Sequence, residues 1–260
     1  MAIGGLKLNS SITEKVFLSM LDILIVASGP YRVTLRSTGV DLMRTDNALK
    51  PGHYDIRPYS RGSKIFSYKS LHVATTQMYI GTIFITHEPC VTRILSRTTT
   101  GRDDFFRARV RERDGKCVIT GTVNTEADVN QWRGFHAAHI FPLSSEEYWV
   151  QNGFSRWITN RMGDHDTGIT SCQNGLLMLS SIHEKFDGFD FSVNPDDGYK
   201  IICFDRDPFK IGGSILDPIC RDPSGEGAVR VELLRWHFRQ AVLANMRGAG
   251  EPSFEMDSQR

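Results

Sequence analysis

Hydrophobic and polar positions follow two different rhythms along this chain of 260 residues. Up to about residue 95 the apolar runs are short and rich in β-branched and aromatic residues, as in YRVTLRS (31–37) and MYIGTIFIT (78–86), with turn-forming segments between them. This pattern predicts strands. The apolar stretch 16–27 is interrupted by Asp22 and is too short to span a bilayer, so it predicts a buried helix or strand rather than a membrane anchor or signal peptide.

The polar, glycine-containing segment SRTTTGRDD (96–104) predicts a boundary between this β-rich region and the rest of the chain. A helix is expected to begin at Asp103 or Asp104, because acidic residues favour the first turn of a helix. Gly115 is expected to end that helix. We therefore place the N-terminal region at residues 1–96.

The expected helix has one apolar face and several basic ones. Phe106 and Val110, four residues apart, would lie together on the apolar face. The remaining faces carry arginines that could contact nucleic-acid phosphates, or could be solvated and pair with Glu112 and Asp114. These arginines are Arg107, Arg109, Arg111 and Arg113.

Beyond this helix, short strands and helices alternate. In chain order we expect a strand over 116–121 that enters a turn at Gly121, a strand over 134–143, a helix over 144–162, a tight Asn174-Gly175 turn leading into a strand, a short helix capped by Ser180 or Ser181, a hairpin turning at 196–198 and a long amphipathic helix from 229. The sequence thus predicts an α+β fold, with a second domain over 97–247 that ends in the long helix and a flexible tail over 248–260.

The composition is that of an ordinary globular protein, without the strong net positive charge of a protein that packages nucleic acid. Lys and Arg number 31 against 30 Asp and Glu, so the net charge is +1 and any contact with nucleic acid must use a local patch. The five cysteines include no CxxC pair, which disfavours both a disulfide framework and a cysteine-rich zinc site. Reduced thiols favour an intracellular protein.

Three residues in chain order carry the candidate chemistry: His139 on an expected strand, Asn174 before an apolar run and His183 on the next helix. Hydrolysis of a phosphodiester needs an activated water and a cation that neutralises the developing charge. His139 could activate the water, because an imidazole is the natural base near neutral pH. His183 could bind a divalent metal, and the amide of Asn174 could bridge backbone groups and fix the spacing of the histidines.

Three ordered blocks between Cys117 and Ile202 carry a resemblance: AAHIFP, QNGLLML and IHEKFDGFDFSVNP. Together they resemble the HNH endonuclease family, in a branch common in fungal proteins. The resemblance implies a ββα-metal module, in which a two-stranded hairpin and a helix hold one divalent ion. It implies that His139 is the general base, Asn174 the orienting residue and His183 a metal ligand.

The chain departs from the better-known HNH pattern directly before the base. Ala138 stands where many members have a residue that binds the metal, and alanine cannot do so. Strand alternation puts His136 and Ala138 on one face and His139 on the other, so His136 is a candidate replacement ligand. Asp187, four residues after His183, could be a further ligand or could orient the His183 ring. The ion could be Mg, Mn, Ni or Zn.

The sequence therefore favours a metal-dependent endonuclease that acts on DNA in preference to RNA and does not associate with a membrane. Cutting both strands would call for a homodimer, because one such site cuts a single strand. The alternatives are an HNH fold that has lost catalysis and serves as a binding module, or one that acts on a small molecule. Trp132, Trp149 and Trp157 could stack on bases, with core packing as the default reading.

Overall fold

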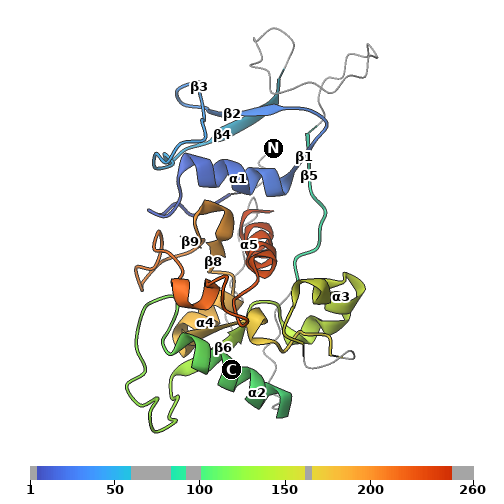
Figure 1. Ribbon diagram of the computed structural model, residues 1–260. Coiled ribbons are helices and arrows are strands. Elements are labelled where there is room, and N and C mark those ends of the chain that lie inside the picture. The colour runs from blue at the N-terminus through green and yellow to red at the C-terminus, as the bar shows by residue number, and fades with distance from the viewer. Residues whose placement is uncertain (1–4, 60–82, 92–100, 162–165, 248–260) are drawn as a thin grey trace, which may run out of the picture. The chain divides into compact units, whose positions relative to one another are not determined.

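The computed structural model of the chain describes residues 5–59, 83–91, 101–161 and 166–247 (Figure 1). The tail expected to be flexible, residues 248–260, lies outside the described residues. Within the described ranges, no helix is long and apolar enough to cross a membrane.

The chain divides into two compact units, one formed by residues 13–88 and the other by residues 2–12 together with 89–260. The second unit is therefore discontinuous in sequence. Its early residues are held by its late ones: Asn9 donates through Nδ2 to the carbonyl of Cys203 at 2.6 Å, and the Cys203 amide donates to Ser11 Oγ at 3.1 Å. Asn9 and Ser11 precede the domain boundary that the sequence predicted near residue 97.

The first unit is rich in strands, as its sequence pattern predicts. Its described elements are α1 (Glu14–Leu24), β1 (Ile25–Ala27), β2 (Tyr31–Leu35), β3 (Val40–Asp41), β4 (Tyr54–Pro58) and β5 (Ile83–Ile85). Strand β2 lies between β3 and β4 in an antiparallel sheet, and β1 pairs with β5. The stretch expected to be a buried helix or strand holds both, because the apolar face of α1 continues directly into β1.

The second unit mixes helices and antiparallel strand pairs, which confirms the α+β class. Its helices are α2 (Gly101–Asp114), α3 (Glu146–Gln151), α4 (Ser180–Asp187) and α5 (Val231–Met246), with 3-10 turns η1 (Leu143–Ser145), η2 (Phe154–Trp157), η3 (Cys172–Asn174), η4 (Pro195–Asp197) and η5 (Pro218–Arg221). Its strands are β6 (Phe135–His139), β7 (Gly175–Leu179), β8 (Phe191–Asn194) and β9 (Lys200–Cys203).

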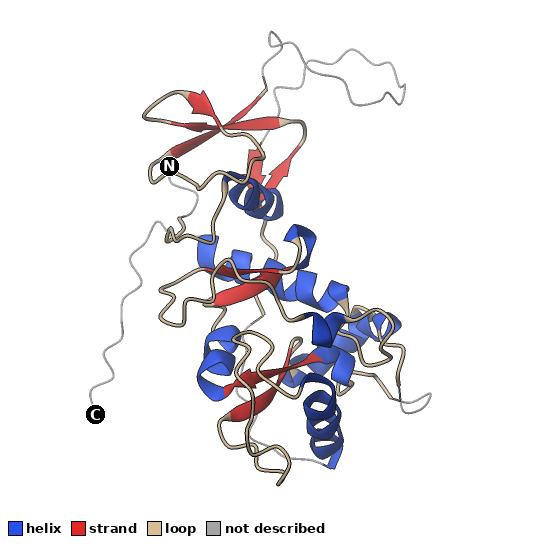
Figure 2. Ribbon diagram, turned by 60° about the vertical axis from the view of Figure 1, so that its left-hand side comes forward, coloured by secondary structure: helices blue, strands red, loops and turns tan. Residues whose placement is uncertain are grey.

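Strands β6 and β7 form an antiparallel pair, and α4 begins directly after β7. This is the two-strands-and-helix module that the sequence predicts. In the register of the pair, His139 lies opposite Gly175 and Ala138 opposite Leu176. Helix α2 also packs on both strands, so the pair has a helix on either side (Figure 2). The hairpin expected at 196–198 is also present, formed by β8 and β9 around η4.

Four local expectations were wrong. Residues 116–121 form a tight turn, closed by the Gly121 amide donating to the Cys117 carbonyl at 2.8 Å, instead of a strand. Neither Ser180 nor Ser181 caps α4, because the N-cap position is taken by Leu179 and no side chain caps it. The Asn174-Gly175 pair is not a two-residue turn, since η3 passes straight into extended backbone. The helix expected over 144–162 is broken into η1, α3 and η2.

Candidate nuclease site

His139, at the end of β6, lies flat against the ring of Phe106 from α2. The ring centroids are 3.7 Å apart and the planes differ by 10°. Phe106 is itself almost fully buried, so it offers a fixed surface for the half-buried imidazole. The stacking orients the His139 ring through its face and does not use its nitrogen atoms.

Gly175 makes this stacking possible. It lies opposite His139 in the strand pair, and a Cβ atom built on it would be 2.6 Å from two atoms of the Phe106 ring. Carbon atoms do not approach that closely, so any side chain at 175 would push Phe106 away from its place over His139. Glycine is therefore required at position 175 because the Phe106 ring lies directly against its backbone.

His136 leaves β6 toward α4, where it meets His183. The Nδ1 atoms of the two rings are 3.2 Å apart, and the rings are perpendicular. Nε2 of His183 lies 3.2 Å from a carboxylate oxygen of Asp187, one turn later on the same helix. A proton on Nε2 that points at the carboxylate leaves the lone pair of His183 on Nδ1, facing His136.

The surroundings of His136 favour its neutral form. Its pKa is lowered from the ordinary value, first because the ring is partly removed from solvent and second because the His183 ring lies beside it. Glu184 and Asp187 act in the opposite direction without reversing the shift. A neutral imidazole has a lone pair available for a metal ion near neutral pH.

Asn174 is fully buried and ties the two strands of the pair together at their ends. Its Oδ1 accepts from the amide of Phe141 at 2.8 Å, and its Nδ2 donates to the carbonyls of Phe141 at 3.0 Å and Ile169 at 2.8 Å. The Ile140 amide donates to the Asn174 carbonyl at 2.9 Å. These bonds fix the segment that follows His139 against the segment that precedes β7.

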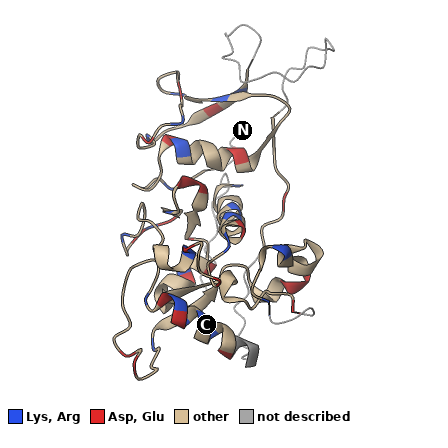
Figure 3. Cartoon of the chain, in the orientation of Figure 1, with Lys and Arg blue, Asp and Glu red and all other residues tan. Residues whose placement is uncertain are grey.

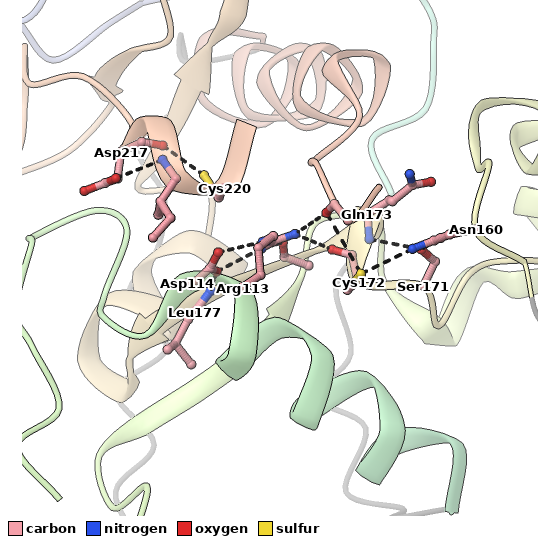
Figure 4. A network of polar contacts seen from close by, with 12 residues as sticks. Arg113, Asp114, Asn160, Ser171, Cys172, Gln173, Leu177, Asp217 and Cys220 are labelled. Atoms are coloured by element: carbon pink, nitrogen blue, oxygen red, sulfur yellow. Dashed lines mark hydrogen bonds and ion pairs between the residues drawn. The ribbon is translucent and has the colours of Figure 1, made fainter. Parts of the chain in front are cut away.

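Arg113 is used inside the fold, in contrast to the expectation that it contacts phosphates. Its side chain is 11% exposed, and its guanidinium forms a two-pronged ion pair with Asp114, at 2.6 and 2.8 Å. It also donates to the carbonyls of Cys172, Gly175 and Gly227 at 2.7, 2.7 and 2.9 Å (Figure 4). With its donors committed to these acceptors, Arg113 has a structural place and not a substrate-facing one.

The same ion pair also holds β7 in place. Asp114, which is fully buried, accepts from the Leu177 amide at 2.8 Å, and the Arg113 bonds reach the residues on either side of Gln173 and Asn174. Burial acts to lower the pKa of Arg113, but the adjacent Asp114 carboxylate outweighs it, so the pKa is raised and the side chain stays charged. The segment that carries Asn174 is therefore fixed from two directions.

Two of the other predicted arginines pair along α2 with acidic neighbours: one with Glu112, which the surface alternative named, and one with Asp104, which it did not. Arg107 forms an ion pair with Asp104, and Arg109 lies 3.6 Å from Glu112. Figure 3 shows basic and acidic residues interspersed along this part of the chain. Arg111 lies instead over the ring of Trp132, 5.0 Å from its centroid.

Sequence reasoning missed several residues that build the site. Phe106 and Asp114 were assigned only to a helix face, although one seats His139 and the other anchors β7. Gln173 was overlooked beside Asn174. It is buried, accepts from the Thr159 amide at 2.9 Å and donates to the Glu226 carbonyl at 2.7 Å. A polar residue inside an otherwise apolar run was the available signal.

The donors present suit two ligands of one divalent ion. Among the described residues, no group of three or more His, Cys, Asp or Glu side chains is arranged to hold a metal. The 3.2 Å between the Nδ1 atoms of His136 and His183 nevertheless matches two ligands of one tetrahedral ion, which lie about 3.3 Å apart when each bond is about 2.0–2.1 Å. The Asp187 carboxylate on the far side of the His183 ring is the partner that metal-binding histidines usually have.

Comparison with known families assigns this region. Residues 117–194, which lie within the second unit, match the family model described as HNH endonuclease. Residues 1–63 match a second model, described as a domain of unknown function (DUF8573). No curated protein and no solved structure matches the chain.

Proposed function

We propose that the second unit is a divalent-metal-dependent endonuclease that hydrolyses phosphodiester bonds, with DNA as its preferred substrate. The observation that carries this proposal is the cluster of His136, His183 and Asp187, which lies within the segment that matches the HNH endonuclease model. Two imidazole nitrogens that face each other, one of them backed by a carboxylate, are a donor set for one divalent ion.

Each residue has a distinct role in this proposal. His136 and His183 would hold the ion through Nδ1, and Asp187 would accept the Nε2 proton of His183 and so fix its ring. When bound, a divalent cation supplies charge stabilisation to the phosphate. His139, seated on Phe106, would take the proton from the attacking water. Asn174 would hold the segments that flank His139 in register.

Ala138 does not prevent this arrangement. It is fully buried and lies opposite Leu176, so its position on β6 serves the core. His136, two residues earlier on the same strand face, supplies the nitrogen that faces His183. The ligand that many HNH domains place next to the base is thus displaced along the strand.

A catalytically inactive binding module is the second candidate. The small number of clustered donors among the described residues favours it, because two imidazoles alone bind a catalytic metal less tightly than a larger donor set. In that case the same hairpin and helix would bind nucleic acid without cutting it. The experiment below separates the two candidates.

The test is the nicking of supercoiled plasmid by the purified full chain with magnesium, manganese, nickel or zinc. Wild type is expected to nick with at least one of these ions, and His139→Ala is expected to lose nicking while it still binds the ion. A labelled RNA of equal length measures the preference for DNA, and the appearance of linear plasmid before full nicking indicates a dimer. DNA binding without nicking by the wild type, with every ion, would support the binding module instead.

A further inference from the structure

Arg111 differs in its contacts from Arg107, Arg109 and Arg113 on the same helix. Arg107, Arg109 and Arg113 each pair with a carboxylate, whereas no carboxylate among the described residues pairs with Arg111. Its Nε is buried and has no hydrogen-bond partner within the described ranges. The packing partner of its guanidinium is the ring of Trp132, 5.0 Å away.

Trp132 is a rigid support for this guanidinium. Its Nε1 donates to Oδ1 of Asn130 at 3.0 Å, and its ring meets the edge of Phe135 with centroids 6.4 Å apart. Phe135 is the first residue of β6 and directly precedes His136. The indole therefore holds Arg111 at the end of β6 that carries a candidate metal ligand. A guanidinium stacked on an aromatic face is ordered in advance and keeps its edge free for an anion.

The electrostatics of this position oppose a structural explanation. Burial lowers the pKa of Arg111 first and the like charge of Arg107 lowers it further, while the Asp104 carboxylate acts in the opposite direction without reversing the shift. The charge of Arg111 also acts on the His136 ring. Glu184 and Asp187 of α4 act on the same ring with the opposite sign and partly offset the charge of Arg111. A bound anion would favour the charged guanidinium and offset the like charge of Arg107.

We propose that the guanidinium of Arg111, supported by Trp132, binds a backbone phosphate of the nucleic acid beside His136 and His183. This inference rests on the proposed function and specifies how the site recognises its substrate. The contact would be with phosphate and not with a base edge, so it would act on every sequence alike. Arg107, Arg109 and Arg113 are committed to carboxylates and contribute little.

The test is the affinity of the full chain for a fluorescein-labelled 20-base-pair DNA in EDTA, where metal-dependent cleavage cannot occur. Arg111→Gln is expected to weaken binding about 10-fold, as loss of one charged hydrogen-bonded contact does. It is also expected to reduce the slope of log K against log salt by about 1. Trp132→Ala should weaken binding in the same direction, and Trp132→Phe should restore most of it, because a phenyl ring also supports a guanidinium.

Arg109→Gln is the matched control, since it removes the same charge from the same helix at a residue paired with Glu112. Equal affinity and equal salt slope for Arg111→Gln and wild type would overturn the inference, as would an effect of the same size in the control. Plasmid nicking is scored separately. A chain that nicks normally with Arg111→Gln retains the proposed function and loses this inference, whereas Arg111-dependent binding without nicking does the reverse.

Discussion

The Nδ1 atoms of His136 and His183 lie 3.2 Å apart, although the residues are 47 positions apart in sequence. Strand β6 carries one ring and helix α4 the other, so the distance reports the packing of the ββα module itself. A hydrogen bond would need a proton on one Nδ1, whereas a shared metal ion would need a lone pair on both. The Asp187 carboxylate beside Nε2 of His183 favours the lone pair on Nδ1 of that ring.

The first prediction concerns these two ligands. His136→Ala and His183→Ala should each weaken manganese or zinc binding by about 100-fold or more, because even the outer partners of metal ligands contribute 10- to 100-fold. Isothermal titration calorimetry of the metal-free chain measures this. His53→Ala, an exposed histidine of the first unit, is the control and should bind as wild type does. Unchanged affinity in His136→Ala would remove it from the metal site.

The second prediction is a pH dependence of stability in the metal-free chain. Because the pKa of His136 is lowered in the folded state, the unfolded chain takes up this proton first as pH falls below about 6.5. The free energy of unfolding should therefore decrease as the pH is lowered through that window. Above the window, His136 should make no difference to how stability depends on pH. Urea unfolding of wild type and His136→Ala in EDTA measures the difference. A fall in stability that is equally steep in both proteins would contradict the assignment.

The third prediction concerns Asn174. Asn174→Ala leaves the amide and carbonyl of Phe141 and the carbonyl of Ile169 without their buried partner, so it should destabilise the fold by about 2–5 kcal/mol. Asn152→Ala, which removes an exposed amide at the end of α3, should change stability little. Chemical denaturation followed by tryptophan fluorescence checks both. A loss no larger in Asn174→Ala than in the control would show that water replaces its bonds.

The fourth prediction separates two arginines on the same helix. Arg113→Ala leaves Asp114 buried without its cation and should cost about 3–5 kcal/mol of stability. Arg109→Ala removes a partly exposed charge and should have little effect. The midpoint of urea unfolding gives both values. Similar midpoints for the two variants would mean that Arg113 is not essential to the packing of β7.

The sequence predicted the features that depend on local pattern. The β6–β7 pair, the helix that carries His183, the hairpin after it and the long α5 all follow from the periodicity of apolar residues and from turn residues. The pairing of His136 with His183 could be proposed because strand alternation separates the two faces of β6. All five cysteines are free.

The features that failed depend on tertiary contacts. Arg113 and Asp114 look like a surface pair at the end of a charged helix, and only the folded chain shows three backbone carbonyls converging on the guanidinium. The stacking of Phe106 on His139 joins residues 33 positions apart, so no local pattern reports it. Ser180 and Ser181 are good helix caps by residue type, but α4 begins so soon after β7 that Leu179 takes the capping position.

The most direct test of the account compares metal binding with cleavage in the same preparations of wild type, His139→Ala and His183→Ala. Manganese titration and plasmid nicking are measured side by side. The account predicts that His139→Ala binds manganese like wild type and does not nick, whereas His183→Ala loses both. Nicking by His139→Ala at the wild-type rate, or equal metal affinity in all three proteins, would contradict the assignment of His139 as base and His183 as ligand.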